Sequence, residues 1–142
     1  MGRGLRTARN TIREVTLAYC IRQSQEAVEL SLKAALRLAG IKPPKCRDVG
    51  PILVEKASAY PEWFRKLIPS LTATSRWLRR EREPSMYGDE ELGLPPSKLY
   101  TEPYAKRALE EAETAYKSVA KLLEEARSRV SGREKFKQKR TG

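Results

Sequence analysis

The chain has 142 residues, of which 39% are hydrophobic and 33% charged, and its formal net charge is +11. This length fits one domain whose core needs no disulfide or metal to hold it. The composition excludes a disordered chain, and no apolar run approaches the ~20 residues of a membrane span. The basic N-terminus is not followed by an unbroken apolar stretch, so we expect a cytoplasmic protein without a secretory signal.

The positive charge is concentrated at the two ends of the sequence. Residues 1–13 contain four arginines and no acid, which gives +4, and residues 133–142 contribute another +4. We therefore divide the chain into a domain, residues 1–132, and a basic C-terminal tail, residues 133–142. Counterion release makes such ends suited to contacts with a polyanion that carry no sequence specificity, and a solvated tail without a partner is the alternative. The tail residues in question are Arg133, Lys135, Lys137, Lys139 and Arg140.

The chain has two cysteines, Cys20 and Cys46, and no histidine. A zinc site with nitrogen and sulfur ligands therefore lacks its ligands, and we expect neither a metal nor a cofactor. One Asn and three Gln among many Arg and Glu point toward a thermophilic source, in which an intracellular disulfide would be tolerated. Two ordinary buried thiols are the interpretation that we favour.

Helical periodicity dominates the first forty residues. Apolar residues recur at spacings of three and four from residue 7 to residue 39, and a second apolar stripe runs beside the first. A helix that is apolar on two faces is a central one, covered on both sides by other helices. Gly40 ends it, and Pro43 and Pro44 prevent its continuation. The second stripe consists of Ala27, Leu30, Ala34 and Leu38.

Two further helices are expected between residues 48 and 83. Asp48 is a suitable N-cap for the first of them, with Pro51 in its first turn. The next segment opens at Pro61 and ends in the charged run 79–83, and we expect Pro69 to break or kink it.

Residues 84–100 are rich in Pro, Gly, Ser and acids and are expected to form a long loop. A last helix is predicted from about Thr101 to Ser131, and Gly132 would end it. We find no alternating strand of useful length. The sequence therefore predicts an all-α fold, an antiparallel (up-and-down) bundle of four to five helices.

A polar row interrupts the apolar surface of the central helix. Gln25, Glu29 and Lys33 follow one another at intervals of four residues and share one helix face. A Glu four residues before a Lys stabilises a helix by ~0.2–0.5 kcal/mol, and most such rows are solvated faces. Because the rest of this helix is apolar, we favour a row that faces a groove or a subunit interface.

The same helix carries a family resemblance. Residues 24–36, SQEAVELSLKAAL, resemble the signature helix of HEPN domains from archaea and bacteria, in which the pattern Q-x-A-x-E-x-x-x-K-A is typical. Residues 40–50, GIKPPKCRDVG, occupy the place of the family's short loop and its "HDVG" element. Residues 77–88 are similar to the family's charged segment that ends in Tyr-Gly, and the alanine-rich last helix agrees as well. The resemblance spans about residues 10–131.

The resemblance implies a HEPN-like helical bundle that dimerises, and it implies RNA cleavage for members that carry an R-x4–6-H motif at the dimer cleft. Here Arg82 lies at that spacing from Tyr87, and Cys46 stands where relatives place histidine. Both differences remove imidazole, the side chain whose ordinary pKa lies near neutral pH, and a tyrosine with a pKa of ~10 is a poor base at pH 7.

We therefore expect a binding cleft in place of a catalytic centre. Arginines bind phosphate through bidentate hydrogen bonds, and a tyrosine can stack on a base. The alternative is that the arginines pair with Glu81, Glu83 and Glu29 and only hold the loop. The candidate nucleotide- or RNA-binding residues are Gln25, Glu29, Lys33, Arg79, Arg80, Arg82 and Tyr87.

Three functions remain open from the sequence. The first is a non-catalytic, homodimeric HEPN-like module that binds nucleotide or RNA and partners a minimal nucleotidyltransferase, as the resemblance implies, in a toxin–antitoxin-like pair. The second is an RNA-cleaving toxin with a degenerate R-x4-Y motif. The third is a structural or adaptor bundle whose polar row fixes the register of a dimer.

Overall fold

The structure, a computed structural model, describes residues 2–45, 48–88, 92–94 and 99–141. For residues 2–3, 5, 7, 11–12, 86–87 and 133–141 it describes the backbone alone. All of its regular elements are helical, as the sequence predicted. They are α1 (Gly2–Leu38), α2 (Gly50–Glu55), the 3₁₀ turn η1 (Ala57–Ala59), α3 (Glu62–Arg80), α4 (Arg82–Tyr87) and α5 (Glu102–Thr141).

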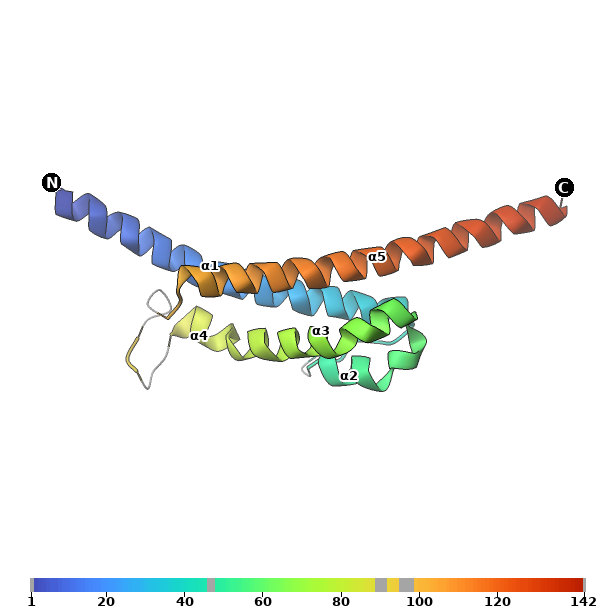
Figure 1. Ribbon diagram of the computed structural model, residues 1–142, viewed down its shortest axis with the longest axis horizontal. Coiled ribbons are helices and arrows are strands. Elements are labelled where there is room, and N and C mark those ends of the chain that lie inside the picture. Colours follow the sequence, from blue (N-terminus) through green and yellow to red (C-terminus); the bar gives the residue numbers. More distant parts are fainter. Residues whose placement is uncertain (1, 46–47, 89–91, 95–98, 142) are drawn as a thin grey trace.

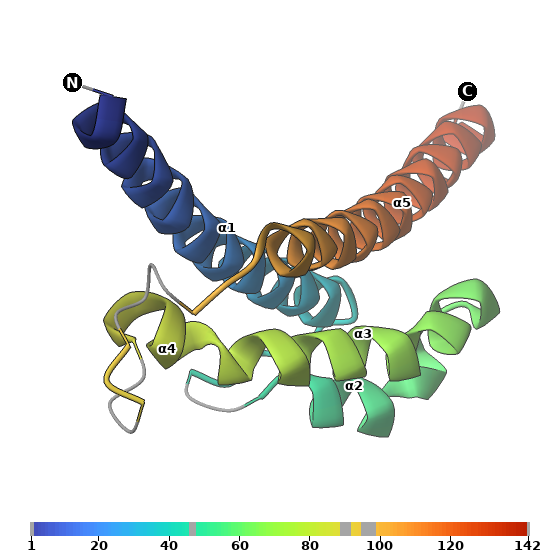
Figure 2. The ribbon, with the colours of Figure 1, turned by 60° about the vertical axis from the view of Figure 1, so that its left-hand side comes forward.

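Three long helices form the up-and-down bundle. Helices α1 and α5 run in the same direction along the bundle, and α3 runs in the opposite direction between them in the sequence (Figure 1). The short helices α2 and α4 pack near the two ends of α3 (Figure 1). The start of α1 and the end of α5 project beyond the bundle as two arms that diverge from each other (Figure 2). The α1–α5 pair is the most extensive helix contact in the fold.

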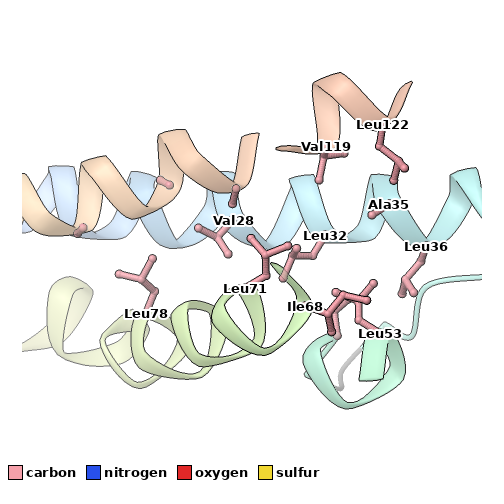
Figure 3. Close-up of a cluster of buried hydrophobic side chains, with 14 of the residues drawn as sticks. Val28, Leu32, Ala35, Leu36, Leu53, Ile68, Leu71, Leu78, Val119 and Leu122 are labelled. Atoms are coloured by element: carbon pink, nitrogen blue, oxygen red, sulfur yellow. The ribbon is translucent and has the colours of Figure 1, made fainter. Parts of the chain in front are cut away.

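The core lies where α1, α3 and α5 meet (Figure 3). Each helix contributes apolar side chains at spacings of three and four, which places them on one face. Ten of these residues are labelled in Figure 3, namely Val28, Leu32, Ala35 and Leu36 of α1, Leu53 of α2, Ile68, Leu71 and Leu78 of α3, and Val119 and Leu122 of α5. Full burial of one of the Val, Leu or Ile side chains contributes about 1.5–3 kcal/mol.

Helix α1 ends as its sequence predicts. Gly40 adopts a φ of 75°, in the left-handed region that glycine enters without strain. Its amide donates to the carbonyl of Arg37 (3.0 Å), and the amide of Ile41 donates to the carbonyl of Leu36 (2.9 Å). These two bonds are those of a Schellman motif, which supplies partners for the last carbonyls of the helix.

The start of α2 differs from the expectation. Val49, not Asp48, is the N-cap, because the Asp48 carboxylate accepts one hydrogen bond from the Gly50 amide (3.1 Å) and one from Ser75 Oγ (3.2 Å). Asp48 thus joins the start of α2 to α3. The two segments approach so closely that a Cβ on Gly50 would lie 2.7 Å from Cγ2 of Thr72.

Of the two outcomes expected at Pro69, a break or a kink, the break does not occur, since α3 continues through this residue. Pro69 removes one backbone donor and sits on the exposed side of the helix. Buried side chains on both sides of it, Ile68 and Leu71, hold the two halves against the core. Tertiary packing therefore outweighs the local cost of the proline.

Two further boundaries differ from the prediction. The first four residues of the expected loop, 84–87, belong to α4, which packs against α1 and is capped by Gly88 with a φ of 85°. The last helix does not end at Gly132, because α5 continues to Thr141. A glycine in a helix interior costs about 1 kcal/mol relative to alanine, which is too little to end a helix when good helix formers lie on both sides.

None of the helices formed by the described residues combines the length and apolar character needed to cross a membrane. Among the same residues, no cluster of histidine, cysteine or carboxylate side chains is arranged to hold a metal ion.

Candidate functional site

The polar row of α1 is a connected set of hydrogen bonds. Gln25 is 4% exposed, and its Nε2 donates to Oε2 of Glu29 (3.0 Å). The other carboxylate oxygen of Glu29 lies 3.3 Å from Nζ of Lys33, and both side chains are about a quarter exposed, at 24% and 27%. The row is therefore partly buried, as expected for a face that lines a depression.

The charge of Glu29 also depends on α4. Burial alone would raise the pKa of the Glu29 carboxyl. The hydrogen bond from Gln25, the hydrogen bond and charge of Lys33 and the charge of Arg82 together hold that pKa below its ordinary value. The fold therefore brings Arg82 into the electrostatic field of the row, and Glu29 remains a carboxylate at neutral pH.

The three arginines lie at the junction of α3 and α4. Arg79 and Arg80 are the last residues of α3 and Arg82 is the first of α4, and all three are exposed. Tyr87 is the last residue of α4, and its side chain lies outside the described part of the structure. The proposed stacking of Tyr87 on a base therefore stays a prediction.

Glu81, which separates these arginines, is held by aromatic side chains. Tyr100 Oη donates to one of its carboxylate oxygens (2.8 Å) and Tyr104 Oη to the other (2.9 Å). Trp77 Nε1 in turn donates to Tyr104 Oη (2.8 Å), and the guanidinium of Arg107 lies 4.7 Å from the centre of the Trp77 ring. We call Glu81, Tyr100, Tyr104 and Trp77 the Glu81 network.

The Glu81 network ties the start of α5 to the α3–α4 junction. Burial, followed by the hydrogen bond and charge of Glu81, raises the pKa of Tyr104 to about 12 and also raises the pKa of Tyr100. Both phenols therefore stay protonated at neutral pH and act as donors. Sequence reasoning missed this network; the available signal was the spacing of two tyrosines by four residues at the start of a helix.

A basic pocket adjoins the far end of the polar row. It has a volume of about 340 Å³, and Pro43 and Pro44 form part of its wall. Its charged lining residues are all cations, namely Lys33, Arg37, Lys42 and Lys45. Of these four residues, only Lys33 is a candidate from the sequence. The signal that could have indicated the pocket is a rigid pair of prolines, flanked by two lysines, that follows the end of a helix.

The remaining sequence candidates lie apart from this site. Cys20 is a free thiol whose Sγ donates to the Ala105 carbonyl (3.8 Å), whereas Cys46 lies outside the described residues. The backbones of residues 2–13 and 133–141 lie at opposite ends of the molecule (Figure 1). The side chains of Arg133, Lys135, Lys137, Lys139 and Arg140 are outside the described part, so their contacts with a polyanion stay predictions.

One apolar face of α1 and α5 is uncovered, although the central helix was expected to be covered on both sides. Leu30 is 67% exposed and Tyr116 64% exposed. The two helices form a groove here with two adjoining hollows of about 590 and 550 Å³, which share Ala27 and Tyr116. We call this the α1/α5 groove. The other large apolar side chains along it are Tyr19, Leu38, Leu109 and Leu123, each more than one-third exposed.

The model of the HEPN domain family matches residues 2–129, which include α1 to α4 and most of α5. No curated protein and no solved structure matches the chain. The match covers the signature helix, the basic pocket, the α3–α4 junction and the Glu81 network in one segment. The chain belongs to the HEPN domain family.

Proposed function

We propose that this protein is a non-catalytic, homodimeric HEPN module of the cytoplasm that binds RNA or nucleotides through phosphate. The observation that carries the proposal is the basic pocket beside the polar row. Among the described residues, its charged lining consists of four cations, of which Lys33 is paired with Glu29, and two prolines restrict the backbone between Lys42 and Lys45. A concave, rigid and uniformly positive surface favours a phosphate group over a neutral ligand.

The charges of Arg82 and Lys33 around Glu29 support the same interpretation. Each lies close enough to Glu29 to lower the pKa of its carboxyl. Glu29 balances only one of these two positive charges, so the row taken together with Arg82 has a net positive charge. Exposed Arg79 and Arg80 add further phosphate donors at the α3–α4 junction.

The chain lacks histidine, the side chain that serves as the acid–base group in RNA-cleaving domains of this kind. The tyrosines of the Glu81 network have raised pKa values, which makes their phenols weaker acids and keeps them from acting as bases at neutral pH. These facts favour binding without cleavage.

The binding test uses labelled single-stranded RNA and fluorescence anisotropy over a range of salt concentrations. Lys42→Glu together with Lys45→Glu should weaken binding by at least about tenfold and reduce the salt slope by ~1.4, because two cations are removed from the phosphate path. Lys56→Glu together with Lys66→Glu changes the net charge equally on exposed positions elsewhere and should weaken binding far less. Equal losses in the two pairs would refute a pocket-centred site.

The same RNA separates the two alternative functions. Cleavage that disappears in Arg82→Ala would establish the degenerate R-x4-Y nuclease and overturn the non-catalytic proposal. Absence of RNA and nucleotide binding at low salt would favour a structural or adaptor bundle. A minimal nucleotidyltransferase as the partner, in a toxin–antitoxin-like pair, is the part of the proposal that rests on the family resemblance; an adjacent gene for such an enzyme would support it.

A further inference from the structure

Three of the four cations that line the basic pocket have no ionic partner within the described part of the chain. Lys33 is paired with Glu29, whereas no carboxylate of the described residues lies within ion-pair distance of Arg37, Lys42 or Lys45. All three side chains are exposed and therefore open to a ligand. Cations that surround one hollow repel each other, and an anion placed between them turns this repulsion into attraction. The hollow is therefore suited to an anionic group.

The backbone that carries these cations is fixed by the fold. Arg37 belongs to the last turn of α1. The side chain of Ile41 packs against the core, and its amide donates to the Leu36 carbonyl (2.9 Å). Lys42 follows directly, and the two prolines that separate it from Lys45 have fixed φ angles. A preorganised site of this kind loses less entropy on binding than a flexible basic tail does.

The phosphate groups of RNA are of two kinds, and they fit this pocket differently. A phosphate inside the chain is a diester, which carries one negative charge and has a sugar on either side. A terminal phosphate is a monoester, which carries about −1.5 to −2 charges at pH 7 and presents three acceptor oxygens. It is attached on one side only, so it can enter a hollow head first. The volume of about 340 Å³ is usual for a ligand pocket, and the three unpartnered cations match the charge and the oxygens of a monoester.

We propose that the basic pocket binds a phosphomonoester, the terminal phosphate of an RNA or of a mononucleotide, through Arg37, Lys42 and Lys45. An internal phosphate, with a sugar on either side, makes fewer of these contacts. Lys33 belongs to both the pocket and the polar row, so an RNA anchored by its end can continue along α1 towards Arg82. This preference rests on the proposed function, since it specifies which phosphate that site takes.

The first experiment compares ligands that differ only in a terminal phosphate. Short oligouridylates with a phosphate at the 5′ end, a phosphate at the 3′ end or hydroxyls at both ends compete, unlabelled, against one labelled oligouridylate in the anisotropy assay, as do uridine monophosphate and uridine. At least one phosphorylated ligand should bind about tenfold or more tightly than its hydroxyl counterpart, because a single hydrogen bond to a charged group accounts for such a factor. The ligand that gains most identifies the source of the terminal phosphate.

Charge reversal locates the preference on the protein. Lys42→Glu together with Lys45→Glu should remove the difference between phosphorylated and hydroxyl ends. Lys56→Glu together with Lys66→Glu, which changes the net charge equally on exposed positions elsewhere, should keep it. Far-UV circular dichroism of both pairs shows whether the helices remain.

The charge of the ligand supplies a second readout. A phosphomonoester gains its second negative charge with a pKa of about 6, whereas an internal diester does not titrate there. The charged groups around the hollow are its four cations and Glu29. The chain has no histidine, the side chain that ordinarily titrates in this range, and the pKa of Glu29 is lowered. The preference for phosphorylated RNA should therefore rise severalfold between about pH 5 and about pH 7.5, with a midpoint at about pH 6.

Each outcome decides a different statement. RNA with hydroxyl ends that binds as tightly as phosphorylated RNA overturns the terminal-phosphate preference and leaves the proposed function in place. A preference that survives Lys42→Glu with Lys45→Glu overturns its assignment to this pocket, and one that stays constant with pH overturns recognition of the doubly charged monoester. Absence of binding by every RNA and by uridine monophosphate at low salt overturns the preference together with the proposed function.

Discussion

Replacing Tyr100 with phenylalanine tests whether the Glu81 network holds the α3–α4 junction. The change removes one hydrogen bond of 2.8 Å to a carboxylate at a side chain that is 9% exposed. A hydrogen bond to a charged group contributes about 1.5–3 kcal/mol, so we expect the free energy of unfolding to fall by about 2 kcal/mol. Tyr104→Phe should cost more, about 3 kcal/mol, because it also leaves Trp77 Nε1 without its acceptor.

The assay is urea unfolding followed by circular dichroism, with all variants at one protein concentration because dimerisation adds to apparent stability. In a Glu81→Ala background, Tyr100→Phe should cost less than about 0.5 kcal/mol, since the acceptor is already gone. Tyr116→Phe, an exposed phenol, serves as the control and should change stability by no more than about 0.5 kcal/mol. Equal costs of Tyr100→Phe in both backgrounds would refute the network.

Three further changes probe the fold. Burial raises the pKa of Tyr60 to about 12, so this phenol should lower wild-type stability by about 1.4 kcal/mol per pH unit as the pH rises from about 10 to about 12, in addition to the declines from Tyr100 and Tyr104. Tyr60→Phe should be less stable by about 1 kcal/mol at pH 7, and its urea midpoints should decline less steeply than those of the wild type up to pH 11. Gly50→Ala should destabilise the protein by about 1–3 kcal/mol and so lower its thermal midpoint, because the new methyl group meets Thr72. Gly132→Ala, with open space around the new methyl group, should not lower the midpoint, and an unchanged midpoint in Gly50→Ala would contradict the close approach to Thr72. Pro69→Ala should stabilise the protein by about 1–3 kcal/mol and so raise its urea midpoint, since the helix regains a backbone donor. A lower urea midpoint would show that the fold needs the proline at this position.

The long helices were predictable because their signal is local. The three-and-four spacing that identified α1 and α5 depends only on neighbours along the chain, and the Gly40 end of α1 follows from one residue's freedom to adopt a positive φ. Pro69 and Gly132 misled for the same reason. A local rule assigns each of them a cost, and the contacts that offset that cost at Pro69 come from elsewhere in the fold.

The candidate site could also be predicted only where its contacts are local in the sequence. The contacts within Gln25, Glu29 and Lys33 follow from their spacing of four, and the structure has them. The hydrogen bonds of Glu81 join it to residues that are 19 and 23 positions away in the sequence, and no periodic pattern predicts such a contact. The uncovered groove was missed because a second apolar stripe on a helix does not say whether this chain or another covers it.

The shared direction of α1 and α5 has an electrostatic consequence. It places the N-terminal segment of +4 and the C-terminal segment of +4 at the two opposite poles of the molecule (Figure 1). The two poles are separated by about the length of α5, 40 residues or roughly 60 Å. This far exceeds the ~8 Å Debye length in physiological salt, so the poles act independently.

Each pole can therefore make its predicted polyanion contact without the other. Two such contacts on one long RNA would bind it more tightly than either alone, because the second contact is intramolecular once the first has formed.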